Sequence, residues 1–193
     1  MMNYNRIAAL AAMGTPKPGL LREIAVAMVL IGLDAGARIL PHPPDFTPVA
    51  ASALFAAVVV RSRALALAVP IGGLFVGDSV LGYYDWRMMA FVYAALALPA
   101  MAVIASERRS RLVVPLLVAS SPIFFAMSNF AVWAFSGIYV PNLGGLIGCY
   151  VAALPFLKNM AAGDLFWGLV LFGALAVVRR AGGKSTAPVL ASV

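Results

Sequence analysis

Apolar residues dominate six stretches of the chain, and short polar or charged segments separate them. The stretches cover residues 21–40, 48–60, 64–84, 86–106, 112–135 and 163–178. A helix needs about 20 largely apolar residues to cross the hydrocarbon core of a bilayer. We therefore predict an all-α membrane protein with six transmembrane helices, of which the second is short.

A seventh apolar stretch, residues 146–157, is harder to assign. It follows Gly144 and Gly145, precedes Lys158 and contains Pro155. Its length is more typical of a helix that enters the bilayer without crossing it, or that lies at the surface. We predict a short re-entrant or interfacial helix here rather than a further span.

The distribution of Lys and Arg favours six spans over seven. With six, all of the 14 Lys and Arg residues except Arg38, Arg87 and Lys158 lie on one side of the membrane. A seventh span would bring Lys158 to that side but would move the basic residues of 179–184 away from it. Because loops rich in Lys and Arg stay in the cytoplasm, we predict six spans in the inner (plasma) membrane, with both termini cytoplasmic.

Composition supports the membrane class and excludes other classes. Hydrophobic residues make up 63% of the 193 residues and charged residues 11%, against about 25% charged residues in a soluble domain. The formal charge of +7 would suggest nucleic-acid binding in a soluble protein, but here the cations form short clusters between apolar stretches. We exclude nucleic acid as a partner. We predict one membrane domain, residues 20–180, between a cytoplasmic tail (1–19) and a disordered tail (181–193).

Ionisable side chains inside the predicted spans mark a candidate site, because a charge in a bilayer is costly unless it faces the bundle interior or water. Asp34 and Arg38 are four residues apart on the first span, so they share a helical face and can pair. Asp78 lies toward the outer end of the third span and has no partner on its own helix. These residues either line a pocket or hold helices together, and the sequence leaves both interpretations open.

The connection between the first two spans has an unusual composition. Four prolines within residues 41–48 flank His42 and Asp45. Proline fixes a backbone angle and removes an amide donor, so this connection is stiff and extended. We predict that it presents His42 and Asp45 over a cavity; the alternative is a rigid spacer with a solvated histidine.

Further polar candidates lie later in the chain. Asn129 and Trp133 are four residues apart on the fifth span, where Asn129 either bridges helices or binds a polar ligand that stacks on Trp133. Cys149 and Tyr150 lie in the re-entrant candidate. A lone membrane cysteine is usually a small apolar filler, and a soft metal ligand is the minority alternative. Asp164 follows Gly163 at the predicted start of the last helix, where capping is its simplest role.

Missing sequence motifs narrow the range of functions, and pairs of small residues at four-residue spacing concern helix packing. The chain contains no P-loop, dinucleotide fingerprint or HExxH motif, so we predict neither an enzyme nor a bound cofactor. One Cys and one His exclude a structural zinc site with four such ligands in one chain. The pairs Gly32–Gly36, Ala53–Ala57 and Gly73–Gly77 let helices approach closely in lipid, and we predict that all of them pack inside the bundle.

Several short motifs carry a resemblance to a known family. They are Arg38, Pro41-His42-Pro43-Pro44, Phe46-Thr47-Pro48, Asn129-Phe130, Val132-Trp133, Gly145-Leu146, Cys149-Tyr150, Pro155-Phe156, Asn159 and Gly163-Asp164. Together they resemble an uncharacterised bacterial family of integral-membrane proteins that are described as transport proteins. That family is similar in organisation to the substrate-binding S components of ECF-type vitamin transporters. The resemblance covers most of residues 38–164, and it implies six helices, an outward-facing pocket and uptake of a micronutrient.

The leading hypothesis is therefore an S-component-like membrane transport protein that binds a vitamin or related small molecule. The residues expected to line its outward cavity are Asp34, Arg38, His42, Asp78, Asn129, Trp133 and Tyr150. The expected partners are the lipid bilayer, a small-molecule substrate and an ECF-type energising module. The alternatives are a solitary cobalamin-type transporter with Cys149 as the metal ligand, and a membrane scaffold that transports nothing.

Overall fold

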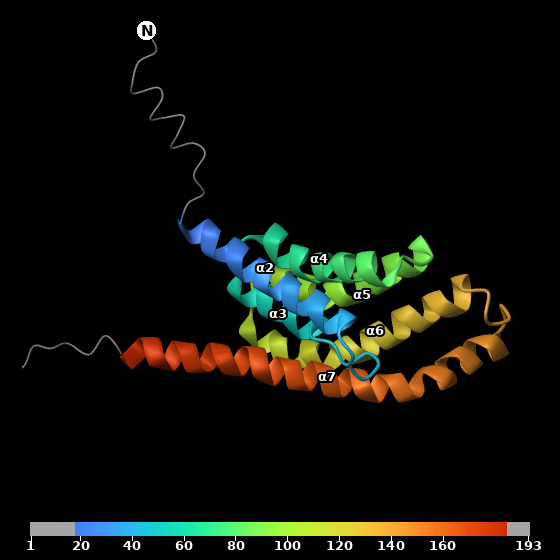
Figure 1. The fold of residues 1–193 in the computed structure, drawn as a ribbon. Coiled ribbons are helices and arrows are strands. Elements are labelled where there is room, and N and C mark those ends of the chain that lie inside the picture. Colours follow the sequence, from blue (N-terminus) through green and yellow to red (C-terminus); the bar gives the residue numbers. More distant parts are fainter. Residues whose placement is uncertain (1–17, 185–193) are drawn as a thin grey trace, which may run out of the picture.

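The computed structural model describes residues 18–184, and every regular element within them is a helix (Figure 1). The helices are α2 (Pro18–Ile39), α3 (Val49–Val59), α4 (Arg63–Leu81), α5 (Trp86–Ala105), the 3-10 helix η1 (Ser110–Leu112), α6 (Val113–Phe135) and α7 (Leu143–Lys184). The predicted tails lie mostly outside the described residues, although residues 181–184 form the last turn of α7. The all-α prediction is confirmed.

Four of these helices are long and apolar enough to cross a bilayer: Arg63–Leu81, Trp86–Ala105, Ser110–Phe135 and Leu143–Ala181. Helix α2 has sufficient length but carries Arg22, Glu23, Asp34 and Arg38. Helix α3 has only 11 residues and is therefore about 16 Å long, roughly half of the hydrocarbon thickness. The membrane class thus agrees with the prediction, whereas six complete crossings are not established by helix length and composition.

Helix α7 corrects the prediction of a separate short helix at 146–157. Those residues and the predicted last span, 163–178, both belong to one helix of 42 residues that contains Pro155. A proline inside a helix removes one hydrogen bond, and helices in a membrane protein tolerate this where neighbours cover the freed group. Lys158 and Asn159, which follow the predicted short helix, lie inside α7. At about 63 Å, α7 extends along the whole bundle (Figure 1).

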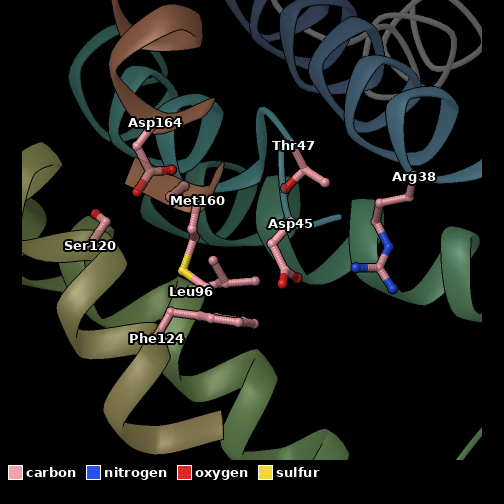
Figure 2. Close-up of a pocket in the computed structure, with 9 residues that line it drawn as sticks. Arg38, Asp45, Thr47, Leu96, Ser120, Phe124, Met160 and Asp164 are labelled. Carbon is pink, nitrogen blue, oxygen red and sulfur yellow. The ribbon is translucent and has the colours of Figure 1, made fainter. Parts of the chain in front are cut away.

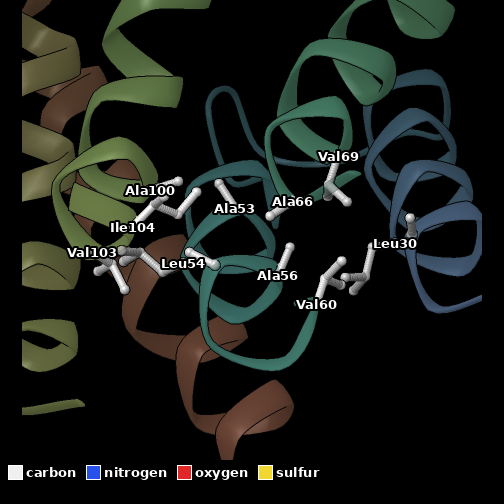
Figure 3. Close-up of a cluster of buried hydrophobic side chains, with 12 residues drawn as sticks. Leu30, Ala53, Leu54, Ala56, Val60, Ala66, Val69, Ala100, Val103 and Ile104 are labelled. Carbon is white, nitrogen blue, oxygen red and sulfur yellow. The ribbon is translucent and has the colours of Figure 1, made fainter. Parts of the chain in front are cut away.

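Helix α3 lies at the centre of the bundle and packs against α2, α4, α5, α6 and α7. Five of its 11 residues are alanines, and Ala53, Ala56 and Ala57 among them have no exposed surface. Figure 3 shows how these small side chains, with Leu54, meet the apolar side chains of α4 and α5. Because alanine projects only a methyl group, the surrounding helices can approach α3 closely, and polar groups on them come within reach of one another.

The ends of the bundle differ in charge. At one end, the Arg108 guanidinium donates hydrogen bonds to the carbonyls of Ala57, Val60 and Arg61 and so closes the C-terminus of α3. At the same end, the Ser62 backbone N–H donates to Glu23 on α2, at 2.9 Å. The connections that carry Arg61, Arg108, Arg109 and Arg111 therefore lie together. The connection of residues 40–48, rich in proline, lies at the other end of α3.

The two predicted glycine pairs differ in their packing. A Cβ added to Gly73 would lie 2.5 Å from the Asp34 Cβ, and one added to Gly77 would lie 2.7 Å from the Arg38 Nε, so α4 packs directly on α2 at both glycines. At Gly32 and Gly36 an added Cβ would meet nothing within 4 Å. The predicted packing is confirmed for the pair on α4 and is wrong for the pair on α2, which faces an open groove beside the 41–46 loop.

Candidate functional site

A small polar cavity lies where α2, the 40–48 connection, α3, α5, α6 and α7 meet (Figure 2). Its lining consists of Arg38, Asp45, Thr47, Ala50, Leu96, Ser120, Phe124, Met160 and Asp164. Its volume is about 40 Å³, which holds a few water molecules but is far below the roughly 300–1,000 Å³ of most small-molecule sites. The structure therefore holds the cavity in a nearly closed form.

Asp164 forms the inner wall of this cavity. It lies in the middle of α7 with 5% of its surface exposed, so the predicted capping role at a helix start is wrong. The Ser121 hydroxyl on α6 donates to the Asp164 Oδ2 at 2.5 Å. Among residues 18–184 no cation pairs with this carboxylate. Asp164 is thus a deeply buried acid that only a hydroxyl group compensates.

Asp45 lies at the mouth of the same cavity. Its backbone has a φ of 61°, a left-handed conformation that aspartate tolerates better than most residues. Its side chain keeps contact with solvent. Partial removal of this carboxyl from water nevertheless raises the pKa of Asp45 from its usual 3.8, although the charges of His42 and Arg38 act in the opposite direction. The loop reaches this position because Gly163 lets the backbone of Phe46 approach α7: an added Cβ there would be 3.1 Å from the Phe46 Cα.

Arg38 connects the cavity to a second polar cluster between α2, α4 and α5. Its guanidinium pairs with Asp78 at 2.5 Å, and the Tyr93 hydroxyl donates to the other oxygen of Asp78 at 2.9 Å. The pairing of Arg38 with Asp34, which the four-residue spacing allowed, is not formed. Asp34 instead accepts the Ser52 hydroxyl on α3 at 2.8 and 2.6 Å. Close packing at Gly77 brings α4 near enough for Asp78 to take Arg38.

The other predicted site residues lie elsewhere. The His42 ring is within 2.7 Å of the Leu40 carbonyl and lines the groove beside α2. In the α6–α7 hairpin, side chains bond to nearby backbone carbonyls: Asn129 to Phe125, Trp133 to Val140, Tyr150 to Ala126 and Cys149 to Asn129. None of these five side chains lines the cavity. The structure brings Asp34, Arg38 and Asp78 together and leaves His42, Asn129, Trp133 and Tyr150 apart from them.

Several lining residues escaped the sequence analysis. They are Thr47, Ser120 and Met160. Nothing in the sequence distinguishes Thr47 or Met160 as a ligand. One signal was available for Ser120: two consecutive serines, Ser120 and Ser121, interrupt the middle of an otherwise apolar stretch. Both are almost fully buried, and they face the inner part of the cavity and Asp164, respectively.

Asp85 and Arg87 form a separate pair at the start of α5. The Asp85 carboxylate caps the helix through the Arg87 backbone N–H, and it also accepts the Arg87 side chain at 2.7 Å. The hydrogen bond from Arg87 lowers the pKa of Asp85 to about 2. The Arg87 guanidinium lies 4.7 Å from the centre of the Phe135 ring. This exposed pair lies outside the cavity and offers a natural control for the buried acids.

Comparison with known proteins identifies a family but no function. The family described as "Family of unknown function (DUF6580)" matches residues 19–187, which is nearly the whole chain. The chain belongs to the DUF6580 family. No curated protein and no solved structure matches it. What this chain can do chemically is therefore inferred from its own side chains.

Those side chains make the cavity acidic. Its lining carries two carboxyl groups, Asp45 and Asp164, and a single guanidinium, Arg38, which already pairs with Asp78. Among the described residues, no three His, Cys, Asp or Glu side chains gather as metal ligands. An excess of carboxylate in a cavity with little water favours a bound cation or ammonium group, because opposite charges attract most strongly where the dielectric constant is low. The lining of the cavity thus carries more carboxylate than guanidinium groups.

Proposed function

We propose that this protein is an S-component-like membrane transport protein that binds and takes up a small micronutrient carrying a positive charge. The observation that supports the proposal is the path from Asp45, in contact with solvent, to Asp164, buried in the bundle, along a single polar cavity (Figure 2). Buried carboxylates without a cation are costly in a membrane protein. A cationic substrate removes that cost when it binds, so it is selected over neutral analogues.

The size of the cavity makes opening part of the mechanism. Met160 projects between the Asp45 and Asp164 sides of the cavity (Figure 2), and methionine is unbranched and changes rotamer easily. The proline-rich connection that carries Asp45 and Thr47 moves as a stiff unit. In our proposal, outward displacement of this connection together with rotation of Met160 admits the substrate. Return of both encloses it between Asp45 and Asp164.

We also propose an orientation of the protein in the membrane. The arginine-rich connections and both termini lie in the cytoplasm, so the Asp45 mouth opens on the other side of the inner membrane. An ECF-type energising module is the candidate partner on the cytoplasmic side. A reconstituted system with and without such a module distinguishes a coupled transporter from a solitary one.

The test uses purified full-length protein and pairs of small vitamins or precursors that differ in charge but little in shape. Binding is measured by calorimetry and uptake in proteoliposomes. Wild type is expected to prefer the cationic member of a pair, and Asp164→Asn to lose at least tenfold in affinity for it. Asp85→Asn is the matched control, because it removes an exposed carboxylate and retains a good helix-capping residue. Equal affinity of wild type, Asp164→Asn and Asp85→Asn for every compound contradicts the proposal.

A non-transporting scaffold is the second candidate, and one observation favours it. Asp34–Ser52, Arg38–Asp78 and Ser121–Asp164 each join two different helices, as structural hydrogen bonds would. If the polar groups only hold helices together, Asp164→Asn lowers thermal stability and leaves uptake unchanged. The cobalamin alternative has less support, because the Cys149 thiol is buried and lies outside the cavity; normal cobalamin binding by Cys149→Ser eliminates it.

A further inference from the structure

A second, larger depression lies on the opposite side of α7 from the 41–46 loop, between α6 and α7. Its volume is about 450 Å³, within the range of sites that bind small molecules. Its walls are apolar and include Val114 and Leu117 on α6 and Leu165, Leu169 and Phe172 on α7. Both helices are long and apolar enough to cross a bilayer. The groove therefore faces lipid along most of its length.

Two glycines of α7 shape the floor of this groove. At Gly168 an added Cβ would lie 2.5 Å from the Leu117 Cδ2, so α6 and α7 touch there. At Gly173 nothing lies within 4 Å of an added Cβ, so the floor is open. The space beside α7 is thus tight at Gly168 and open at Gly173. The direction from Gly168 to Gly173 leads to the end of the bundle that carries the arginine-rich connections.

The end of the groove near Arg179 is polar and positively charged. Ser110 and Arg179 are the polar residues of its lining, and Arg109 and Arg111 flank Ser110 in the chain. The salt bridges found within residues 18–184 involve neither Arg111 nor Arg179, and residues 185–193 contain no acidic side chain. An apolar groove that ends at uncompensated cations matches the two parts of an anionic phospholipid.

We propose that this groove binds one anionic phospholipid, with an acyl chain between α6 and α7 and the phosphate at Ser110 and Arg179. Basic pockets between transmembrane helices on the cytoplasmic side are suited to anionic headgroups. The acyl chain fills the open floor at Gly173, which would otherwise leave a void beside the helices. A zwitterionic lipid has the same chains, but its choline group meets the same cations with repulsion. Binding is therefore selective for the headgroup charge.

The experiment is native mass spectrometry of the full-length protein with phosphatidylglycerol or phosphatidylcholine of identical chains. Wild type is expected to retain phosphatidylglycerol in preference. Arg179→Gln is expected to reduce that preference about fivefold, the effect of one basic residue near an anionic surface. Arg180→Gln is the matched control, because Arg180 is adjacent but does not line the groove. Equal retention of both lipids by wild type, or equal loss of preference in Arg179→Gln and Arg180→Gln, overturns the proposal.

A second variant tests the position of the acyl chain. Gly173→Leu fills open space and is expected to reduce retention of both lipids while leaving their ratio unchanged. A groove that instead receives a helix of a second copy would show loss of a dimer in Gly173→Leu with lipid retention intact, and that result also overturns the proposal. The readout does not involve transport, so its outcome is independent of the proposed function.

Discussion

The α2–α4 and α6–α7 contacts both bury carboxylates between helices, and they do so in different ways. Between α2 and α4, Asp78 has an arginine and a tyrosine as partners, and glycines close the space around the pair. Between α6 and α7, Asp164 has one serine hydroxyl as its partner and borders a cavity. The first contact is compensated and tightly packed; the second is neither.

The difference separates structural acids from candidate functional ones. A buried carboxylate that pairs with a guanidinium resists disruption, because removing one partner strands the other charge. A buried acid with unused hydrogen-bonding capacity beside a void has something left to bind. By this criterion Asp78 holds α2 to α4, and Asp164 is the residue that a substrate would satisfy. Three substitutions probe the α2–α4 contact and the mouth of the cavity, with effects that decrease in turn.

The largest effect is expected for Arg38→Met. This change strands the Asp78 carboxylate in the bundle with only Tyr93 as a donor, and we expect a loss of about 3 kcal/mol in the free energy of unfolding. The double variant Arg38→Met with Asp78→Leu should recover most of it, because no unpaired charge remains. Unfolding in mixed micelles measures both. A single variant as stable as wild type would mean that the pair does not hold α2 to α4.

A smaller loss, about 1–3 kcal/mol, is expected for Gly73→Ala, because the new methyl group overlaps Asp34 and forces the two helices apart. The matched control is Gly32→Ala, in a small-residue pair of the same spacing that faces open space. We expect this control to be as stable as wild type or slightly more so, since alanine is the better helix former. Similar losses of stability in Gly73→Ala and Gly32→Ala would contradict the difference in packing between these two glycines.

The smallest effect is expected for Asp45→Asn, and it depends on pH. The pKa of Asp45 is raised in the folded protein, so ionisation of this side chain disfavours folding as pH rises above its ordinary value of 3.8. Asparagine tolerates the left-handed backbone and does not ionise. The melting temperature of Asp45→Asn should therefore exceed that of wild type at neutral pH, and the difference should vanish below the unfolded pKa. A difference that is constant with pH would contradict the raised pKa.

Much of the architecture could be predicted from hydropathy, because the cost of placing polar groups in lipid acts on each stretch separately. The boundaries of α4, α5 and α6 lie within a few residues of the predicted spans. The prediction of two separate elements in α7 was wrong because Pro155, Lys158 and Asn159 are signals of a helix end only where nothing else supports the helix. In α7, contacts with α3 and α6 provide that support.

The candidate site could be predicted only in part. Polarity inside apolar stretches marked Asp34, Arg38 and Asp78, and all three are engaged in contacts between helices. The same criterion gave Asn129, Trp133 and Tyr150, whose bonds go to backbone carbonyls within their own hairpin. Sequence spacing cannot tell a side chain that lines a cavity from one that bonds to a backbone carbonyl of its own or a neighbouring helix.

The sequence by itself determined that this chain is helical, suited to a bilayer and asymmetric in its charge, since these properties are sums over single residues. The tertiary structure alone decided that Arg38 pairs with Asp78, that Asp34 turns to Ser52 and that a cavity separates Asp45 from Asp164. The reason is distance: an electrostatic partner must lie within a few ångströms. Which groups come that close depends on where glycine and alanine let two helices meet.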